Sequence, residues 1–77
     1  MTPDEWFARL EALLPAVARV SEAERTALLD LARVAAHASE RWTAPVSTYL
    51  VGRALEGAGP EERAAAIARL VDELGPS

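Results

Sequence analysis

Four helix-start signals divide this chain and constrain its fold more than any other feature. Thr2 and Ser21 are each followed three positions later by a glutamate, the pattern of a capping box that closes the first turn of a helix. Pro45 and Pro60 suit a first helical turn, because proline has no amide hydrogen to pair there. The signals predict four helices, at about 3–14, 22–41, 46–56 and 60–74.

Apolar side chains recur at helical spacing in all four segments, so each helix has one face to bury. In the third segment Val46, Leu50 and Ala54 form the expected core stripe. We expect one core to which all four helices contribute, made of Leu10, Leu13, Leu28, Leu31, Ala35, Leu50, Ile67 and Leu70. The chain is therefore predicted to be all-α, a single compact domain of four short helices spanning residues 1–77.

Pro15 lies at the end of the first predicted helix. Its ring either ends that helix near Leu14 or kinks it toward Val20, because proline removes an amide and clashes with the preceding turn. We favour an end near Leu14, followed by a short turn.

Composition narrows the functional classes. The chain has 77 residues and no cysteine, which excludes disulfides, a thiolate zinc site and a cysteine nucleophile. Its net charge is −4, and its eight basic residues, all arginine, are spread along the chain, so we expect no nucleic-acid partner. No apolar run approaches the roughly 20 residues of a membrane span and no segment resembles a signal peptide, so we expect a cytoplasmic protein without a membrane partner.

The chemistry-bearing residues gather in the middle third of the chain. On a helix over 22–41, Asp30, Arg33, His37 and Arg41 fall close together, roughly opposite the apolar stripe. One interpretation of this polar stripe is a site for an anion or a partner's carboxylate, in which charged neighbours tune His37 near neutral pH. The other is a solvated face with weak ion pairs.

Catalysis has little support in the sequence. A single histidine without cysteines makes a poor zinc site. Ser47 and Thr48 would need His37 as a base, and hydroxyls just after Pro45 more often satisfy first-turn amides. We therefore expect no enzyme activity, no metal and no cofactor.

The second and third predicted helices have apolar arcs wider than a core of this size needs. Leu29 and Ala36 widen one arc, and Val51 and Leu55 widen the other. Either the first and fourth helices bury these positions within one chain, or the positions form the two-fold interface of a homodimer. We favour the homodimer.

The same middle region resembles a known family. The resemblance covers roughly residues 4–56 and is carried by LLDLAR at 28–33, Ala36-His37, Arg41, Ala44-Pro45, Thr48, Leu50 and Gly52. These residues are similar to the signature of a small helical domain family of actinobacteria and allied bacteria, encoded beside or fused to molybdenum cofactor guanylyltransferases and formate dehydrogenase accessory proteins. The resemblance implies a setting in molybdenum cofactor maturation, and it does not imply an enzyme.

Two functional hypotheses follow. The first is an interaction module that docks on a protein partner, such as a molybdenum cofactor guanylyltransferase or a formate dehydrogenase accessory protein, or on itself. The second is a small-ligand binder, in which Arg33, His37 and Arg41 hold a phosphate or pterin-type anion near Tyr49. The acidic net charge and the lack of a glycine-rich phosphate cradle favour the first hypothesis.

Overall fold

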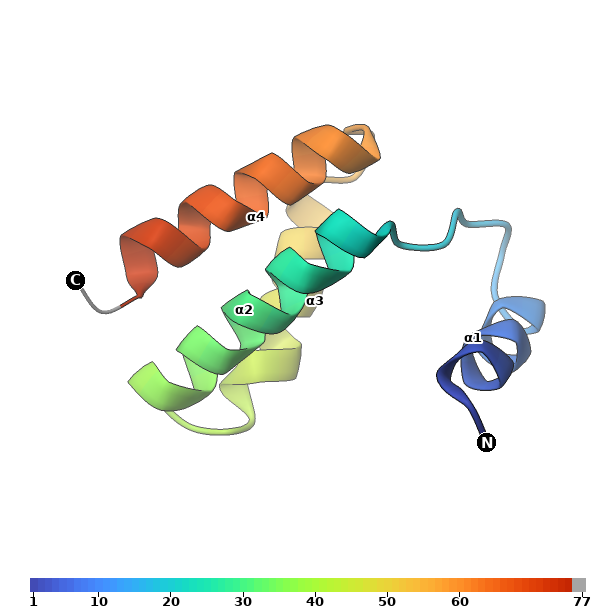
Figure 1. Ribbon diagram of the computed structural model, residues 1–77, viewed down its shortest axis with the longest axis horizontal. Helices are drawn as coiled ribbons and strands as arrows, with labels where there is room; N and C mark the ends of the chain where they lie inside the picture. Colours follow the sequence, from blue (N-terminus) through green and yellow to red (C-terminus); the bar gives the residue numbers. More distant parts are fainter. Residues whose placement is uncertain (76–77) are drawn as a thin grey trace.

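Four α-helices make up the computed structural model, which describes residues 1–75 (Figure 1). They are α1 (Pro3–Ala12), α2 (Glu22–Ala38), α3 (Thr43–Ala54) and α4 (Pro60–Leu74). No strand occurs in this part of the chain, and none of its helices is long and apolar enough to cross a membrane. The prediction of an all-α domain of four short helices is confirmed.

The predicted start signals are visible as hydrogen bonds at the first two helices. Before α1, the Thr2 hydroxyl accepts a hydrogen bond from the Glu5 amide at 3.1 Å, and the Glu5 carboxylate accepts one from the Thr2 amide at 3.4 Å. Before α2, the Ser21 hydroxyl accepts from the Glu24 amide at 3.2 Å. The Glu24 carboxylate does not complete this second capping box, because it is bound by α4 instead. α4 begins at Pro60, as predicted.

Several helix boundaries differ from the prediction, among them the end of α3, which is Ala54 and not Glu56. α1 ends at Ala12, so Pro15 follows the helix and does not kink it. α2 ends at Ala38 and α3 begins at Thr43, both earlier than predicted. The Thr43 hydroxyl donates hydrogen bonds to backbone carbonyls on the far side of this turn, to that of Ala35 at 3.1 Å and to that of Glu40 at 2.6 Å. The same two carbonyls also accept backbone amides, that of Ala35 from Ser39 and that of Glu40 from Thr43, so the hydroxyl reinforces a turn that the backbone closes.

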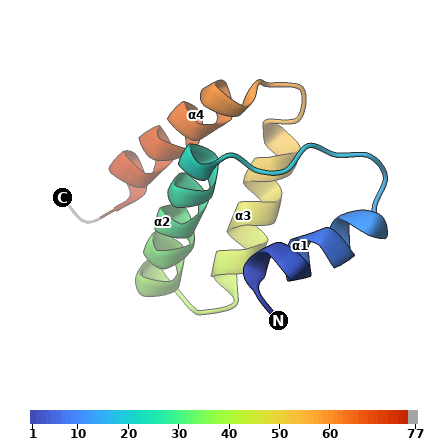
Figure 2. The ribbon, with the colours of Figure 1, turned by 45° about the vertical axis from the view of Figure 1, so that its right-hand side comes forward.

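The core lies where α2 meets α3 and α4. α2 is the central helix: α4 runs along one side of it in the same general direction, and α3 returns the chain along another side (Figures 1 and 2). The buried apolar side chains are Ala27, Leu31 and Ile67, and the half-buried Leu28, Val51, Leu55 and Val71 pack around them. The core positions predicted at Leu28, Leu31 and Ile67 are therefore confirmed.

α1 stands apart from the other three helices, joined to α2 by the non-helical segment 13–21 (Figure 1). The prediction that all four helices share one core is wrong, because Leu10 is 37% exposed, Leu13 85% and Leu50 54%. Helical periodicity identifies the apolar face of a helix, but it does not show whether the same chain covers that face.

Candidate functional site

The predicted polar stripe is only partly assembled. Asp30, Arg33 and His37 lie on α2, where an Arg33 guanidinium nitrogen is 3.2 Å from the Asp30 carboxylate. Arg41 does not continue the stripe, because α2 ends at Ala38 and Arg41 falls in the turn before α3. Arg33 and His37 are exposed, and a solvated pair such as Arg33–Asp30 contributes little to stability.

Tyr49 lies on α3, away from the polar stripe. The Arg53 guanidinium sits over its exposed ring, 5.7 Å from the ring centre, which is a cation–π contact. Both side chains line a groove of about 530 Å³, together with Val17, Ala18, Val20, Glu24, Gly52, Glu56, Gly57 and Arg63. No member of the polar stripe lines this groove, so the predicted anion ligands and Tyr49 do not share it.

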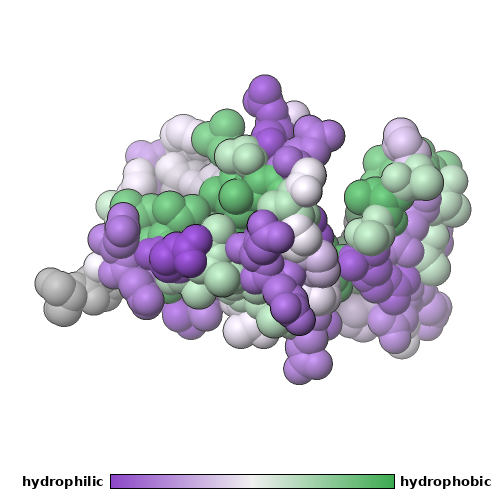
Figure 3. Space-filling view, turned by 90° about the horizontal axis from the view of Figure 1, so that it is seen from above, coloured by the Kyte–Doolittle hydropathy of each residue, from purple (hydrophilic) through white to green (hydrophobic). Residues whose placement is uncertain are grey.

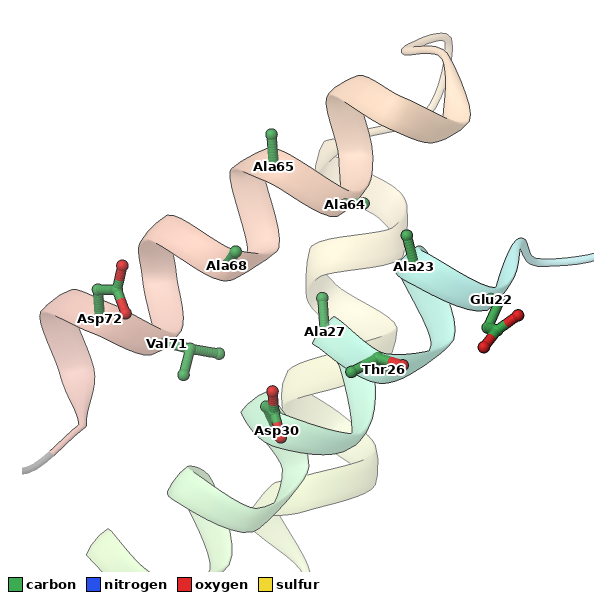
Figure 4. Close-up of a pocket in the computed structure, with 10 residues that line it drawn as sticks. All are labelled: Glu22, Ala23, Thr26, Ala27, Asp30, Ala64, Ala65, Ala68, Val71 and Asp72. Carbon is green, nitrogen blue, oxygen red and sulfur yellow. The ribbon is translucent and has the colours of Figure 1, made fainter.

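A second groove, of about 750 Å³, runs between α2 and α4 (Figure 4). Its lining residues are Glu22, Ala23, Thr26, Ala27, Asp30, Ala64, Ala65, Ala68, Val71 and Asp72. The charged members of this set are three carboxylates, so the groove repels anions and provides no cation to bind a phosphate or a pterin-type anion.

Glu24 and Arg63 form an ion pair between the first turns of α2 and α4. Arg63 Nε donates to Glu24 Oε2 at 2.6 Å, and Nη2 donates to Oε1 at 3.2 Å. A third nitrogen of the same guanidinium donates to the Ala58 carbonyl. The hydrogen bond to Glu24 raises the pKa of Arg63 above its usual value. Because both oxygens of the buried Glu24 carboxylate are bound, this residue is structural; the sequence pattern had indicated only a capping role.

Of the two hydroxyl groups just after Pro45, that of Thr48 has a structural partner. The Thr48 hydroxyl donates to the Pro45 carbonyl at 3.0 Å, so it pairs with a carbonyl and not with the first-turn amide that we expected. Ser47 lines a mostly aliphatic groove of about 430 Å³ between α2, α3 and α4. Within residues 1–75, no group of three or more acidic, histidine or cysteine side chains is arranged to hold a metal ion.

The four predicted dimer positions fall into different environments. Leu29 is 64% exposed on α2, and Ala36 is half-buried. Val51 and Leu55 pack against the core, as in the alternative that places these positions within one chain. The homodimer itself stays a prediction, but these four residues do not present one continuous free face.

α3 turns a neighbouring side to the core, about 100° round the helix from the one predicted, and Leu50 lines the edge of the aliphatic groove beside Leu31 and Val51. The predicted core stripe is exposed, with Val46 at 45% and Leu50 at 54%, and Ala54 is exposed as well. The core is contacted instead by Val51 and Leu55, which had been assigned to the widening of the arc. α3 has two apolar stripes, so the sequence pattern alone did not show which of them faces the core.

Two exposed apolar faces result, on helices whose apolar residues the sequence pattern had assigned to the core. The α1 face consists of Trp6, Phe7 and Leu10 with Leu14 just after the helix, and the α3 face consists of Val46, Tyr49 and Leu50 with Trp42 at the N-cap. Each set recurs at helical spacing, so one partner surface can contact a whole set at once. In Figure 3 the α1 lobe stands beside the rest of the molecule, with hydrophobic residues gathered on it.

The surface area of the chain confirms how open this arrangement is. Its accessible surface is 6087 Å², whereas a folded monomer of 8.2 kDa is expected to expose about 4,500 Å². Its radius of gyration is 13.1 Å, against about 11.5 Å expected for a compact domain of this length. The observed area of 6087 Å² thus exceeds the area expected for a compact monomer by about 1,500 Å².

Arg19 ties the segment that follows α1 back onto that helix. Its Nε donates to Glu11 Oε2 at 3.1 Å and its Nη2 to Glu11 Oε1 at 3.2 Å, while Nη1 lies 3.5 Å from Asp4. The hydrogen bond from Arg19 lowers the pKa of Glu11. The ion pairs join α1 and the adjoining segment into one arm.

Comparison with known proteins gives one match. A family model described as a domain of unknown function, DUF6457, matches residues 1–76. No curated protein and no solved structure shows significant similarity to the chain.

Proposed function

The chain belongs to the DUF6457 family of domains of unknown function, and we propose that it is a non-catalytic protein-interaction module. One observation carries this proposal: large apolar side chains are exposed together on the α1 face and on the α3 face. Soluble monomers rarely expose contiguous apolar patches of this kind unless another molecule covers them. Tryptophan and tyrosine, which occur on these two faces, are also the residues enriched among those that dominate binding energy at protein interfaces.

The chemistry of the other described residues supports the same class of function. The buried carboxylate of Glu24 is occupied by Arg63, and the Arg33 guanidinium is paired with Asp30. The groove between α2 and α4 carries only negative charge, so it does not favour the alternative of an anion-binding domain.

We place the partner among the proteins of molybdenum cofactor maturation, and we expect the chain to meet it in the cytoplasm. Support for this part of the proposal comes from the resemblance of residues 4–56, whose family is encoded beside or fused to molybdenum cofactor guanylyltransferases and formate dehydrogenase accessory proteins. The α1 and α3 faces would supply the apolar centre of the contact, with the surrounding arginines and carboxylates at its rim.

Isothermal titration against the purified molybdenum cofactor guanylyltransferase of the same organism tests the proposal. The full chain should bind, and Trp6→Ala or Trp42→Ala should weaken binding about 30-fold, because truncating a central interface tryptophan costs about 2 kcal/mol. Leu29→Ala is the matched control, because Leu29 is equally exposed but lies outside both faces. Absence of a complex, or equal binding by all variants, would overturn the proposal.

A further inference from the structure

We infer that a second copy of this chain covers the two apolar faces, with α1 of each copy packed on the α3 face of the other. This inference rests on the proposed function, because it names an occupant of the same interaction surface. It places the homodimer contact on residues different from Leu29, Ala36, Val51 and Leu55.

The excess exposed area of the single chain is large enough for a protein interface. A standard protein interface buries about 800 Å² on each partner. The chain exposes about 1,500 Å² beyond the expectation for a compact monomer, which is enough for a stable interface of this kind. Exchange of α1 would remove the excess from both copies at once.

Each chain has one α1 face and one α3 face, so two copies can cover each other's faces completely. Each chain contributes one apolar helix face that is only half covered, with side chains 37–53% exposed, and one apolar face of α3 on which such a helix could pack. A two-fold pair uses both from each copy and leaves neither exposed, so the assembly closes at two chains. The α1 face has the spacing of a helix that docks in an apolar groove, with Trp6, Phe7 and Leu10 as anchors on the helix and Leu14 just beyond its end.

The connection of α1 to the rest of the chain would also allow α1 to pack on a second copy. α1 stands apart from α2, α3 and α4, and segment 13–21 connects it to them. The pairs of Arg19 with Glu11 and Asp4 tie this segment to α1, while Val17 and Val20 of the segment line the groove beside Tyr49. An arm joined through a non-helical connection is the element that domain-swapped dimers exchange.

One consequence concerns the partner of the proposed function. Because the second copy and that partner use the same faces, self-association and partner binding exclude each other. The apparent affinity for the partner should therefore fall as the concentration of this chain rises.

Sedimentation equilibrium of the full chain tests the inference without any partner. The wild type should have twice the mass of 8.2 kDa at micromolar concentration. Leu10→Asp and Leu50→Arg each place a charge on one face and should raise the dimer dissociation constant at least tenfold. Leu29→Asp should not change it. Circular dichroism should show unchanged helix content in all three, since these side chains lie outside the core.

Mixing the Leu10→Asp and Leu50→Arg variants shows whether α1 packs on α3 of the other copy or on α3 of its own chain. In a mixed pair, one α1–α3 contact is wild type and the other sets an aspartate against an arginine, so dimers should return. A monomeric wild type, or a mixture that stays monomeric, would overturn the inference. Either result leaves the titration against the guanylyltransferase as an independent test of the proposed function.

Discussion

At the residue scale, Arg63 connects three parts of the fold through one guanidinium group. It binds the buried carboxylate of Glu24 at the start of α2 and the carbonyl of Ala58 in the loop before α4. The Glu24 side chain is only 7% exposed, so it depends on this partner.

Arg63→Ala should lower the free energy of unfolding by about 3 kcal/mol, because it leaves a buried carboxylate without a cation. Arg69→Ala, at an exposed arginine of the same helix, should change stability by less than about 0.5 kcal/mol. Urea unfolding followed by circular dichroism measures both. Equal losses from the two substitutions would show that the buried pair has no special weight.

Two leucines that the sequence treats alike differ in burial. Leu31 is 3% exposed and Leu13 is 85% exposed, although both lie on predicted apolar faces. Leu31→Ala should destabilise the fold by about 2–5 kcal/mol, since it opens a cavity in a small core. Leu13→Ala should cost less than about 0.5 kcal/mol. Thermal melts of the two variants at the same concentration compare them, and similar losses would contradict the three-helix core.

At the element scale, helix starts were easier to predict than helix ends. Thr2 and Ser21 predict the starts of α1 and α2, because a capping hydroxyl accepts a hydrogen bond from an amide only three residues ahead. This relation is local, so the sequence alone reveals it. At the end of α2, the Ala35 carbonyl accepts the Ser39 amide and also the Thr43 hydroxyl, which reaches back across the turn. Such a bond requires the turn to exist first, so the apolar pattern did not reveal it.

The arm that contains α1 should respond to acid. The hydrogen bond from Arg19 lowers the pKa of Glu11 in the folded chain, below the value of about 4.3 for a free glutamate. The pairing therefore stabilises the arm above pH about 4 and is lost as the pH falls through the lowered pKa. The Arg19 Nε resonance followed by NMR from neutral to acid pH should report this loss.

Glu11→Gln provides the control for the acid transition of the arm. The amide cannot ionise, so the acid-induced shift of the Arg19 resonance should be largely absent. Asp4→Asn should keep it, because Asp4 lies farther from Arg19, at 3.5 Å, than Glu11 does. An unchanged shift in Glu11→Gln would assign the transition to another group.

At the scale of the whole molecule, composition and periodicity predicted the all-α class and four helices, but not which faces are covered. Val46 and Leu50 fit a core stripe as well as Val51 and Leu55 do, and only tertiary packing chose the second pair. The prediction of a four-residue polar stripe was wrong for a similar reason, because Arg41 belongs to the stripe only if α2 continues past Ala38. The site and the core thus depended on contacts between helices.

The central claim is that another chain covers the α1 and α3 faces. Trp6 and Trp42, the two tryptophans of the sequence, lie one on each face and are 53% and 63% exposed in the single chain. Acrylamide quenching of their fluorescence therefore reports cover on both faces directly. At micromolar concentration, the wild type should be quenched several-fold less than Leu10→Asp, and dilution should bring the two together. Equal quenching of wild type and Leu10→Asp at every concentration would contradict the account.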